Sequence, residues 1–310
     1  MKNIAIIGAG QLGSRHLQAL AKINEDVNLY IVDPSEQSLA ISQQRFEEVN
    51  LSNKKLICTQ KITDLPKTLE FIVISTNSKQ RLGVLKVLFA HADVKYLLLE
   101  KFLFPSIYEY SEAASILEKK SSKVFVNCAR RMWLSYQKLK ENLDTTSKIQ
   151  LNVTGVNWNL ASNAIHFLDL FLYLINEKEA IIDTSLLENE LMENKRPGYI
   201  EFAGTLTITT QNGHKLILTS NKAGEEPMMI TISSLSQYFE IDEVNQRMML
   251  NGQKHDFPMY YQSELTNRVY EQLQQTGHCQ LVEYEEAMKE HLLLLNAFNE
   301  FLGEREGAIT

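Results

Sequence analysis

The 310-residue sequence has little cysteine and no long apolar run, and each absence excludes a class of protein. Its three cysteines, Cys58, Cys128 and Cys279, are far apart and form no CxxC pair, so neither a disulfide framework nor a zinc cluster is expected. Three free thiols are compatible with a reducing cytoplasm, which is the location we expect. No apolar segment reaches the length of a membrane span, and the N-terminus does not resemble a signal peptide.

Positive charge is also scarce, because 31 Lys and Arg face 38 Asp and Glu, a formal net charge of −7. A nucleic-acid or anionic-membrane binder needs an electropositive face, so we expect neither partner. No residues cluster as ligands, so no metal is expected. With 44% apolar and 22% charged residues, the composition is that of a globular protein, and the length favours two domains.

The first 127 residues alternate short apolar segments with helical ones. These segments are rich in Ile, Val and Leu and lack clean alternation, as strands buried on both faces do. Six strands in such an order predict an α/β domain with a parallel, doubly wound sheet. The expected strands are residues 3–8, 27–33, 55–58, 71–75, 95–100 and 123–127.

After residue 128 the pattern becomes α+β. An alternating strand over 148–159 and an apolar helix over 159–175 precede a region with two Asn-Gly hairpin signals, at 212–213 and 251–252. Two helices, 263–277 and 283–302, follow. We therefore predict domains 1–127 and 128–310, the second built on a mainly antiparallel sheet. One face of that sheet would lack helices, so we expect a homodimer or homotetramer formed through it.

A glycine-rich turn, Gly8-x-Gly10-x-x-Gly13, follows the first strand and opens a helix. Gly8 permits the tight turn, Gly10 lets a pyrophosphate approach the backbone, and Gly13 lets helix and strand pack closely. The N–H groups at the helix start attract phosphates. Asp33, 20 residues after Gly13, is placed to bind a ribose hydroxyl. The alternative is a simple glycine turn with a surface Asp, but the strand–turn–helix context favours a dinucleotide.

The charge of Asp33 indicates which dinucleotide binds. A carboxylate accepts hydrogen bonds from a 2′-hydroxyl and repels a 2′-phosphate, and no Arg follows in Pro34, Ser35 and Glu36. We therefore expect NAD rather than NADP. FAD shares the fingerprint, but the rest of the chain does not suggest a flavoprotein.

Lys101 follows the fifth expected strand. Ligands of open α/β sheets bind beyond the carboxyl ends of the strands, so Lys101 points toward the expected nicotinamide. There it can hydrogen-bond a substrate oxygen and stabilise negative charge. The alternative is a solvated Lys at a strand end.

The helix over 159–175 carries His166, with Ser162 and Asn163 one turn earlier on the same face. The ordinary pKa of an imidazole is close to neutral, so the side chain of His166 is suited to exchange a proton at physiological pH. A lone His in an apolar helix is, however, usually a satisfied core residue. Asp169, one turn later, either orients His166 or ties down a neighbouring segment.

Arg130 and Arg131 follow the sixth strand. Their guanidinium groups either meet the cofactor or an anionic substrate, or are solvated at a helix start. His16 and Tyr136 are expected to be structural.

Five segments, in this order, resemble the Gfo/Idh/MocA oxidoreductases, the glucose-fructose oxidoreductase and inositol dehydrogenase group. They are GAGQLGSRH, FIVISTNSKQ, the EK of LLLEKFLF, ARRMWLSYQKLK and SNAIHFLDLFLYL. The resemblance covers essentially the whole chain and implies a Rossmann domain followed by an α+β domain. That family's EKP motif supplies a catalytic Lys and its DxxxHxxD motif an acid/base His, which implies catalytic roles for Lys101 and His166.

The resemblance also implies the remaining site residues. Cofactor contacts are expected from Gly8, Gly10, Gln11, Leu12, Gly13, Asp33, Ser75, Thr76, Asn77, Glu100 and Lys101, and substrate contacts from Lys101, Arg131, Ser162, Asn163 and His166. There are two departures from the family pattern. Phe102 replaces the Pro, and Ser162 stands where the family has its first Asp, which implies a different substrate geometry or lost chemistry.

The expected activity is NAD-dependent hydride transfer to or from a secondary alcohol or ketone of a sugar-like substrate, such as a nucleotide sugar or sugar acid. Lys101 would polarise the substrate oxygen and His166 would exchange its proton. Two alternatives stay open: an NAD-binding sensor without turnover, and an epimerase or eliminase that recycles a tightly held cofactor.

Overall fold

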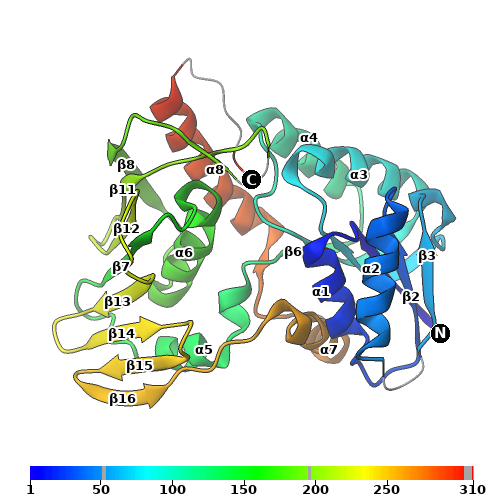
Figure 1. Ribbon diagram of the computed structural model, residues 1–310, viewed down its shortest axis with the longest axis horizontal. Helices are drawn as coiled ribbons and strands as arrows, with labels where there is room; N and C mark the ends of the chain where they lie inside the picture. The colour runs from blue at the N-terminus through cyan, green and yellow to red at the C-terminus, as the bar shows by residue number, and fades with distance from the viewer. Residues whose placement is uncertain (51–53, 195–196, 304–308, 310) are drawn as a thin grey trace. The chain divides into compact units, whose positions relative to one another are not determined.

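The computed structural model describes residues 1–50, 54–194, 197–303 and 309. They form two compact units (Figure 1). The first unit comprises Met1–Ala129 and Tyr260–Glu285, and the second comprises Arg130–Met259 and Glu286–Thr310. Among the described residues, no helix is both long enough and apolar enough to cross a membrane.

The first unit contains a seven-stranded sheet in the order β17-β6-β5-β4-β1-β2-β3. Six strands are parallel, in the doubly wound Rossmann order that the sequence predicts, and β17 pairs antiparallel with β6. The central strands are buried on both faces, which explains their continuous apolar runs. The strands are β1 (Lys2–Ile7), β2 (Val27–Val32), β3 (Leu56–Thr59), β4 (Thr68–Ile74), β5 (Asp93–Leu99), β6 (Lys123–Val126) and β17 (Val282–Glu283).

Helices connect these strands. α1 packs against α2 and α7, and α3 packs against α4 (Figure 1). The α-helices are α1 (Gln11–Leu20), α2 (Glu36–Glu47), α3 (Ser78–His91), α4 (Ile107–Leu117) and α7 (Thr266–Thr276), and the short 3-10 helices are η1 (Ile62–Asp64), η2 (Ala129–Met132) and η3 (Gln262–Glu264).

The segment Tyr260–Glu285 corrects the predicted assignment of 128–310 to the second domain. It belongs to the first unit, where η3 and α7 pack on α1 and β17 extends the parallel sheet at its edge. The two residues of β17 are too few to show a periodicity. Only their pairing with β6 reveals which sheet they join.

The second unit contains an eight-stranded sheet in the order β16-β15-β14-β13-β7-β12-β11-β8. Only β12 and β7 pair in parallel, so the sheet is mainly antiparallel as predicted. Both Asn-Gly turns form hairpins, with positive φ at Gly213 and Gly252. The strands are β7 (Gln150–Val156), β8 (Ala180–Leu187), β11 (Gly204–Thr210), β12 (Lys215–Asn221), β13 (Met229–Ser233), β14 (Tyr238–Asp242), β15 (Arg247–Leu250) and β16 (Gln253–Asp256).

Alternate residues of this sheet are buried against the helices of the unit. Helix α6 packs on β12 and against α5, and most of its side chains are buried. A separate two-stranded ladder, β9 with β10, contacts α6. These elements are α5 (Leu134–Asn142), α6 (Leu160–Ile175), α8 (Tyr284–Leu302), β9 (Met192–Glu193) and β10 (Ile200–Glu201).

Candidate functional site

The glycine-rich turn lies between the end of β1 and the start of α1. Gly8 has a backbone φ of +102°, which residues with a side chain rarely adopt. A Cβ on Gly13 would lie 1.8 Å from the Gly8 carbonyl oxygen and 2.7 Å from the Ser75 hydroxyl oxygen. A Cβ on Gly10, in contrast, would meet no described atom within 4 Å. The turn is therefore closed on its protein side and open at Gly10, as a pyrophosphate cradle requires.

The first turn of α1 offers backbone N–H groups. Its N-cap residue is Gly10, and within the described residues no side chain caps the helix start and no acidic residue lies in the first turn. Gln11 and Leu12 are exposed there. The N–H groups and the positive end of the helix dipole therefore fit a bound phosphate.

Asp33 lies at the end of β2, beside the turn. Its Oδ2 accepts a hydrogen bond from the Ala9 N–H at 2.7 Å, and its Oδ1 accepts one from the Ser35 N–H at 2.9 Å. The carboxylate is half-buried, at the place where a ribose lies in folds of this kind. The turn, the helix start and Asp33 together fit NAD.

The loop after β4 begins with Ser75, Thr76 and Asn77, and Ser75 contacts the glycine turn. The Ser75 hydroxyl donates to the Gly8 carbonyl oxygen at 2.8 Å, and Asn77 caps the N-terminus of α3. The Thr76 carbonyl oxygen accepts from the Arg81 guanidinium. These contacts support the loop itself, and the predicted cofactor contacts of Ser75, Thr76 and Asn77 stay predictions.

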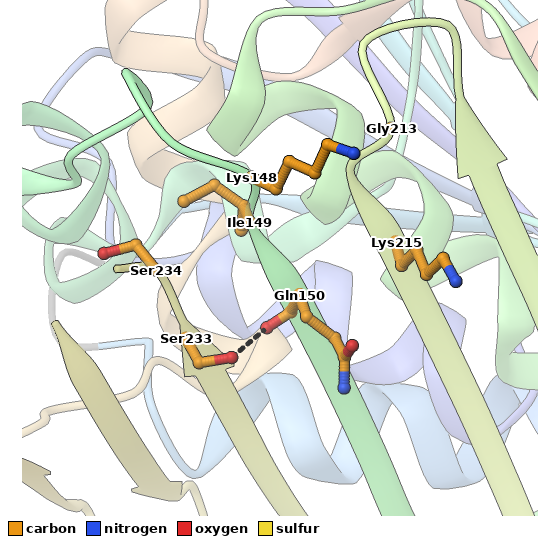
Figure 2. A pocket seen from close by; sticks show the side chains of 7 residues that line it. All are labelled: Lys148, Ile149, Gln150, Gly213, Lys215, Ser233 and Ser234. Atoms are coloured by element: carbon orange, nitrogen blue, oxygen red, sulfur yellow. Dashed lines mark hydrogen bonds between the residues drawn. The ribbon is translucent and has the colours of Figure 1, made fainter. Parts of the chain in front are cut away.

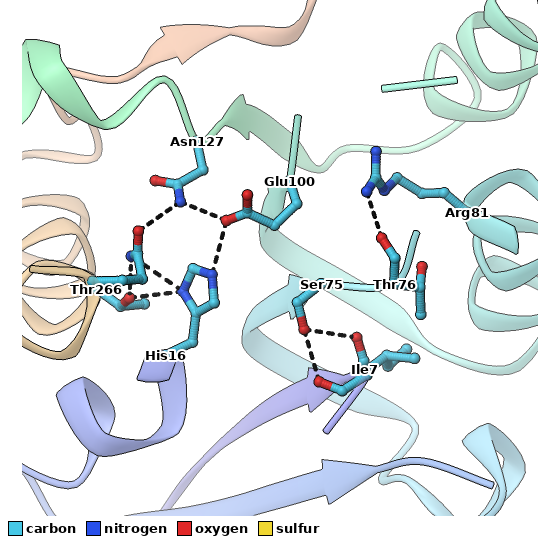
Figure 3. A network of polar contacts seen from close by, with 10 residues as sticks. Ile7, His16, Ser75, Thr76, Arg81, Glu100, Asn127 and Thr266 are labelled. Atoms are coloured by element: carbon cyan, nitrogen blue, oxygen red, sulfur yellow. Dashed lines mark hydrogen bonds and ion pairs between the residues drawn. The ribbon is translucent and has the colours of Figure 1, made fainter. Parts of the chain in front are cut away.

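Glu100, directly after β5, belongs to a buried polar network (Figure 3). The His16 Nε2 lies 2.8 Å from Glu100 Oε1, and the Nδ1 of this imidazole lies 2.8 Å from the Thr266 hydroxyl oxygen. Asn127 also donates to Glu100 Oε1. Burial raises the pKa of Glu100, but His16, Asn127 and the nearby Arg81 charge outweigh burial and hold this pKa below its usual value. The carboxylate predicted to contact the cofactor is therefore engaged within the protein.

Lys101 follows Glu100 and is half-buried. The buried Phe102 and Leu103 come next, and both of their carbonyl oxygens accept hydrogen bonds from Arg81, at 2.7 Å for Leu103. The Lys101–Phe102 peptide bond is cis. Because β1, β4 and β5 are neighbours in a parallel sheet, the loops after them lie at one edge. Lys101 therefore lies at the edge that carries the glycine turn.

In the second unit, α6 carries residues predicted to contact the substrate. Asn163 and His166 are half-buried, whereas Ser162 is buried. Asn163 donates to the Trp158 carbonyl oxygen at 2.8 Å. Because the segment is helical throughout, Asn163 and His166 share one face. Their contact with a substrate stays a prediction.

Ser162 binds a carboxylate that the sequence analysis missed. The Ser162 hydroxyl donates to Glu201 Oε1, and the Ala161 N–H donates to Glu201 Oε2 at 2.8 Å. The Asn194 amide also donates to Oε1, at 2.8 Å. Burial raises the pKa of Glu201 and outweighs these hydrogen bonds, which act in the opposite direction. Glu201 lies on the two-residue strand β10, which leaves no periodic signal in the sequence.

Arg131 is enclosed by carboxylates. Its Nη2 lies 2.8 Å from Asp169 Oδ1, 3.0 Å from Glu286 Oε1 and 3.4 Å from Glu290 Oε1. Burial raises the pKa of Asp169 to about 6, although the guanidinium acts in the opposite direction. Of the two roles left open for Asp169, the structure therefore supports the one in which it ties down a neighbouring segment.

Arg130 is engaged in the same way. Its Nε and Nη2 each lie 2.7 Å from a carboxylate oxygen of Glu243, which also accepts a hydrogen bond from the Tyr136 hydroxyl at 2.7 Å. Both guanidinium groups are therefore balanced inside the second unit. Their predicted contact with an anionic substrate or the cofactor gains no support from these ion pairs, and neither group is solvated.

A pocket of about 370 Å³ lies elsewhere in the second unit (Figure 2). Its lining residues are Lys148, Ile149, Gln150, Gly213, Lys215, Ser233 and Ser234. None of them was predicted to bind cofactor or substrate. Over residues 1–50, 54–194 and 197–303, no group of three His, Cys, Asp or Glu side chains is placed to hold a metal ion.

Comparisons with known proteins agree with this geometry. Residues 2–128 match the model of the oxidoreductase family with an NAD-binding Rossmann fold, Gfo/Idh/MocA. A comparison of the sequence with curated proteins finds no match.

Solved structures share the fold over nearly the whole chain. An oxidoreductase from Agrobacterium radiobacter, in complex with NAD⁺, L-tartaric acid and magnesium, has a TM-score of 0.74 at 14% identity, over 98% of this chain and 97% of that one. A UDP-N-acetylglucosamine 3-dehydrogenase from Acidithiobacillus ferrooxidans has a TM-score of 0.70 at 13% identity, over 96% of each chain. A biliverdin reductase from a Synechocystis species, bound to biliverdin and NADP⁺, has a TM-score of 0.70 at 12% identity, over 96% of this chain and 98% of that one.

At these identities the likeness shows the fold, and the named ligands differ too widely to indicate one substrate. The family match is more informative. It confirms the predicted cofactor and the predicted class, an NAD(P)-dependent oxidoreductase. Residues 2–128, which carry strands β1 to β6 of the first unit, are therefore similar to the NAD-binding Rossmann domain of the Gfo/Idh/MocA oxidoreductase family.

Proposed function

We propose that the protein is an NAD-dependent dehydrogenase that transfers hydride to or from a secondary alcohol or ketone of a sugar-like substrate. One observation carries the proposal: Lys101 lies at the same sheet edge as a glycine turn that is open at Gly10 and flanked by Asp33. The nicotinamide of NAD supplies the hydride chemistry when the cofactor is bound.

The first task of the protein's own residues is to hold the dinucleotide. The N–H groups at the start of α1 would bind the pyrophosphate, which approaches the backbone at Gly10. Asp33 would accept hydrogen bonds from the ribose hydroxyls and repel a 2′-phosphate. This selects NAD over NADP.

Lys101 would donate a hydrogen bond to the substrate oxygen. Its ammonium group stabilises the negative charge that this oxygen carries when hydride leaves or arrives at the attached carbon. Both of its neighbours in sequence are held, Glu100 by His16 and Phe102 by Arg81. Because both neighbours are held, Lys101 is already in position, and its side chain needs no reorganisation before it acts on the substrate.

His166 would exchange the proton of the substrate hydroxyl. It is the half-buried imidazole of α6, and an imidazole can both accept and donate a proton near neutral pH. Asn163, on the same helical face, would contact the substrate.

The test is NADH formation from NAD⁺ with a panel of nucleotide sugars, sugar acids and polyols. Lys101→Ala and His166→Asn should each lower kcat by at least about 100-fold with NAD⁺ binding retained. Lys95→Ala is the matched control, because Lys95 lies on β5 and its exposed side chain pairs with Glu70. Equal turnover in Lys101→Ala and the wild type would refute the role of Lys101.

If no compound of the panel yields NADH while NAD⁺ binds tightly, the result would favour the alternative of an NAD-binding sensor without turnover. Purified protein that already carries nucleotide and converts a sugar without net NADH would favour the recycling enzyme.

We also propose that the outer face of the eight-stranded sheet binds a second copy of the chain. On the inner strands of this sheet, several residues of that face are small and half-buried, among them Thr205 and Thr207 on β11 and Thr231 on β13. Light scattering should then show a dimer or tetramer, and Thr207→Arg should shift it toward the monomer. A wild-type monomer would refute this proposal.

A further inference from the structure

We propose that Glu201 is a positioning residue of the site on α6. From β10 it supplies a carboxylate at the helix start, beside Ser162, and thereby fixes the turn that leads to His166. The kinetic part of this inference rests on the proposed function, whereas its structural part can be tested separately.

The carboxylate of Glu201 is almost fully enclosed, since the residue is 2% exposed. Its Oε2 accepts hydrogen bonds from the N–H groups of Ala161, at 2.8 Å, and Ser162, at 3.4 Å. Its Oε1 accepts from the Ser162 hydroxyl and from the Asn194 amide. The Asn194 amide also lies 3.2 Å from the Ser162 hydroxyl oxygen. Glu201 thus accepts hydrogen bonds from both the backbone and a side chain of the first turn of α6.

This contact replaces the usual helix cap. Among the residues that the structure describes, the side chain of Asn159, the N-cap residue of α6, makes no capping hydrogen bond, and the first turn of α6 contains no acidic residue. A carboxylate at this place satisfies the N–H groups of the first turn and interacts favourably with the helix dipole. Because Glu201 is distant in sequence, it ties the helix start to the β9–β10 ladder.

The cap is also close to His166. Ser162 and His166 are four residues apart on one helical face, about 6 Å along the axis. The Glu201 charge therefore lies about one turn from the imidazole. It should both hold the helix that carries the imidazole and favour the imidazolium form of His166.

A carboxylate on residue 162 and the carboxylate of Glu201 would lie at the same place. An Asp at 162 would place its carboxyl carbon near the present Ser162 hydroxyl oxygen, which is within hydrogen-bond contact of Glu201 Oε1. Two carboxylates so close cannot both ionise at ordinary cost. The site therefore accommodates one carboxylate, from the helix or from β10, and this chain carries it on β10.

The experiment is a charge exchange between these positions. Glu201→Gln removes the charge, Ser162→Asp adds a second carboxylate, and the double variant moves the carboxylate to the helix. Glu193→Gln is the matched control, because Glu193 is exposed on the neighbouring strand β9. Two readouts are recorded: kcat and KM on a substrate found in the panel, and the pKa of His166 by NMR.

We expect Glu201→Gln and Ser162→Asp each to lower kcat by about tenfold while leaving the KM for NAD⁺ unchanged. Glu201→Gln should lower the His166 pKa by about half a unit to one unit, because it removes a negative charge one turn away. The double variant should recover kcat to within about threefold of the wild type and restore the His166 pKa. Glu193→Gln should change neither readout.

A Glu201→Gln variant with wild-type kcat and an unchanged His166 pKa would overturn the proposal. So would a double variant that restores thermal stability but neither readout, since Glu201 would then be a structural cap only. If Glu201→Gln does not fold, the folded double variant is compared with the wild type, and a His166 pKa outside half a unit of the wild-type value overturns the proposal. A wild type that turns over no member of the panel contradicts the proposed function, whereas the titration of His166 still decides the role of Glu201.

Discussion

Two glycines of the turn after β1 should respond in opposite ways to the same substitution. A Cβ at position 10 would meet nothing within 4 Å among the described residues, whereas a Cβ at position 13 would lie 1.8 Å from the Gly8 carbonyl oxygen. Gly10→Ala should therefore preserve the fold and obstruct the cofactor. Gly13→Ala should damage the fold itself.

The magnitudes follow from the local geometry. Gly10 has a φ of −66° and a ψ of −169°, which Ala adopts freely. Ala gains about 0.4–1 kcal/mol from the unfolded state and loses a similar amount as a poorer N-cap, so the free energy of unfolding should change by less than about 0.5 kcal/mol. A methyl group in the path of the pyrophosphate should weaken NAD⁺ binding about 10- to 100-fold, or about 1.4–2.8 kcal/mol.

Gly13→Ala requires helix and turn to separate by more than an ångström, because the obstructing atom belongs to the backbone. Overpacking of this kind costs about 1–3 kcal/mol. Urea unfolding measures the stability of each variant, and titration with NAD⁺ measures its affinity. Gly83→Ala in α3 is the control, since a Cβ at position 83 would also meet no atom of the described residues within 4 Å. Wild-type affinity for NAD⁺ in Gly10→Ala would refute the placement of the pyrophosphate at this turn.

Three further substitutions test other parts of the structure. Asp33→Ala should weaken NAD⁺ binding about tenfold and narrow the preference over NADP⁺, as measured by parallel titrations. Arg81→Lys keeps the charge but loses the forked contact with three carbonyl oxygens, so kcat should fall with little change in the KM for NAD⁺. Burial raises the pKa of Asp169 from 3.8 to about 6, so its ionisation destabilises the fold above pH 6, and this cost disappears as the pH falls toward 4. Asp169→Asn should therefore stabilise the protein by about 1–2 kcal/mol more at pH 7.5 than at pH 4.5 in chemical denaturation, and an equal effect at both pH values would contradict this.

Local patterns determined much of the fold in advance. The central strands β1, β4 and β5 are buried on both faces over most of their length, so their apolar runs are visible in the sequence. Both Asn-Gly pairs form the hairpins that they predict. The assignment of 260–285 to the second domain was wrong, because β17 is two residues long and joins the first sheet only by pairing with β6. Which sheet a short strand joins depends on distant residues.

The same division holds for the candidate site. The glycine turn, Asp33 and Lys101 could be identified from the sequence, because their positions follow from where strands end. The partners of the remaining polar side chains could not. His16 meets Glu100 across 84 residues, Ser162 meets Glu201 across 39, and Arg131 meets Glu290 across 159.

Such pairs are selected by strand order and helix packing, which bring segments together that no local pattern connects. The sequence by itself therefore determined the place of the glycine-rich turn between strand and helix and the residue types available for chemistry. Only the tertiary structure decided which charges are balanced inside the protein. A buried charge without a partner carries a large desolvation cost, and the fold determines which groups lie close enough to pair with it.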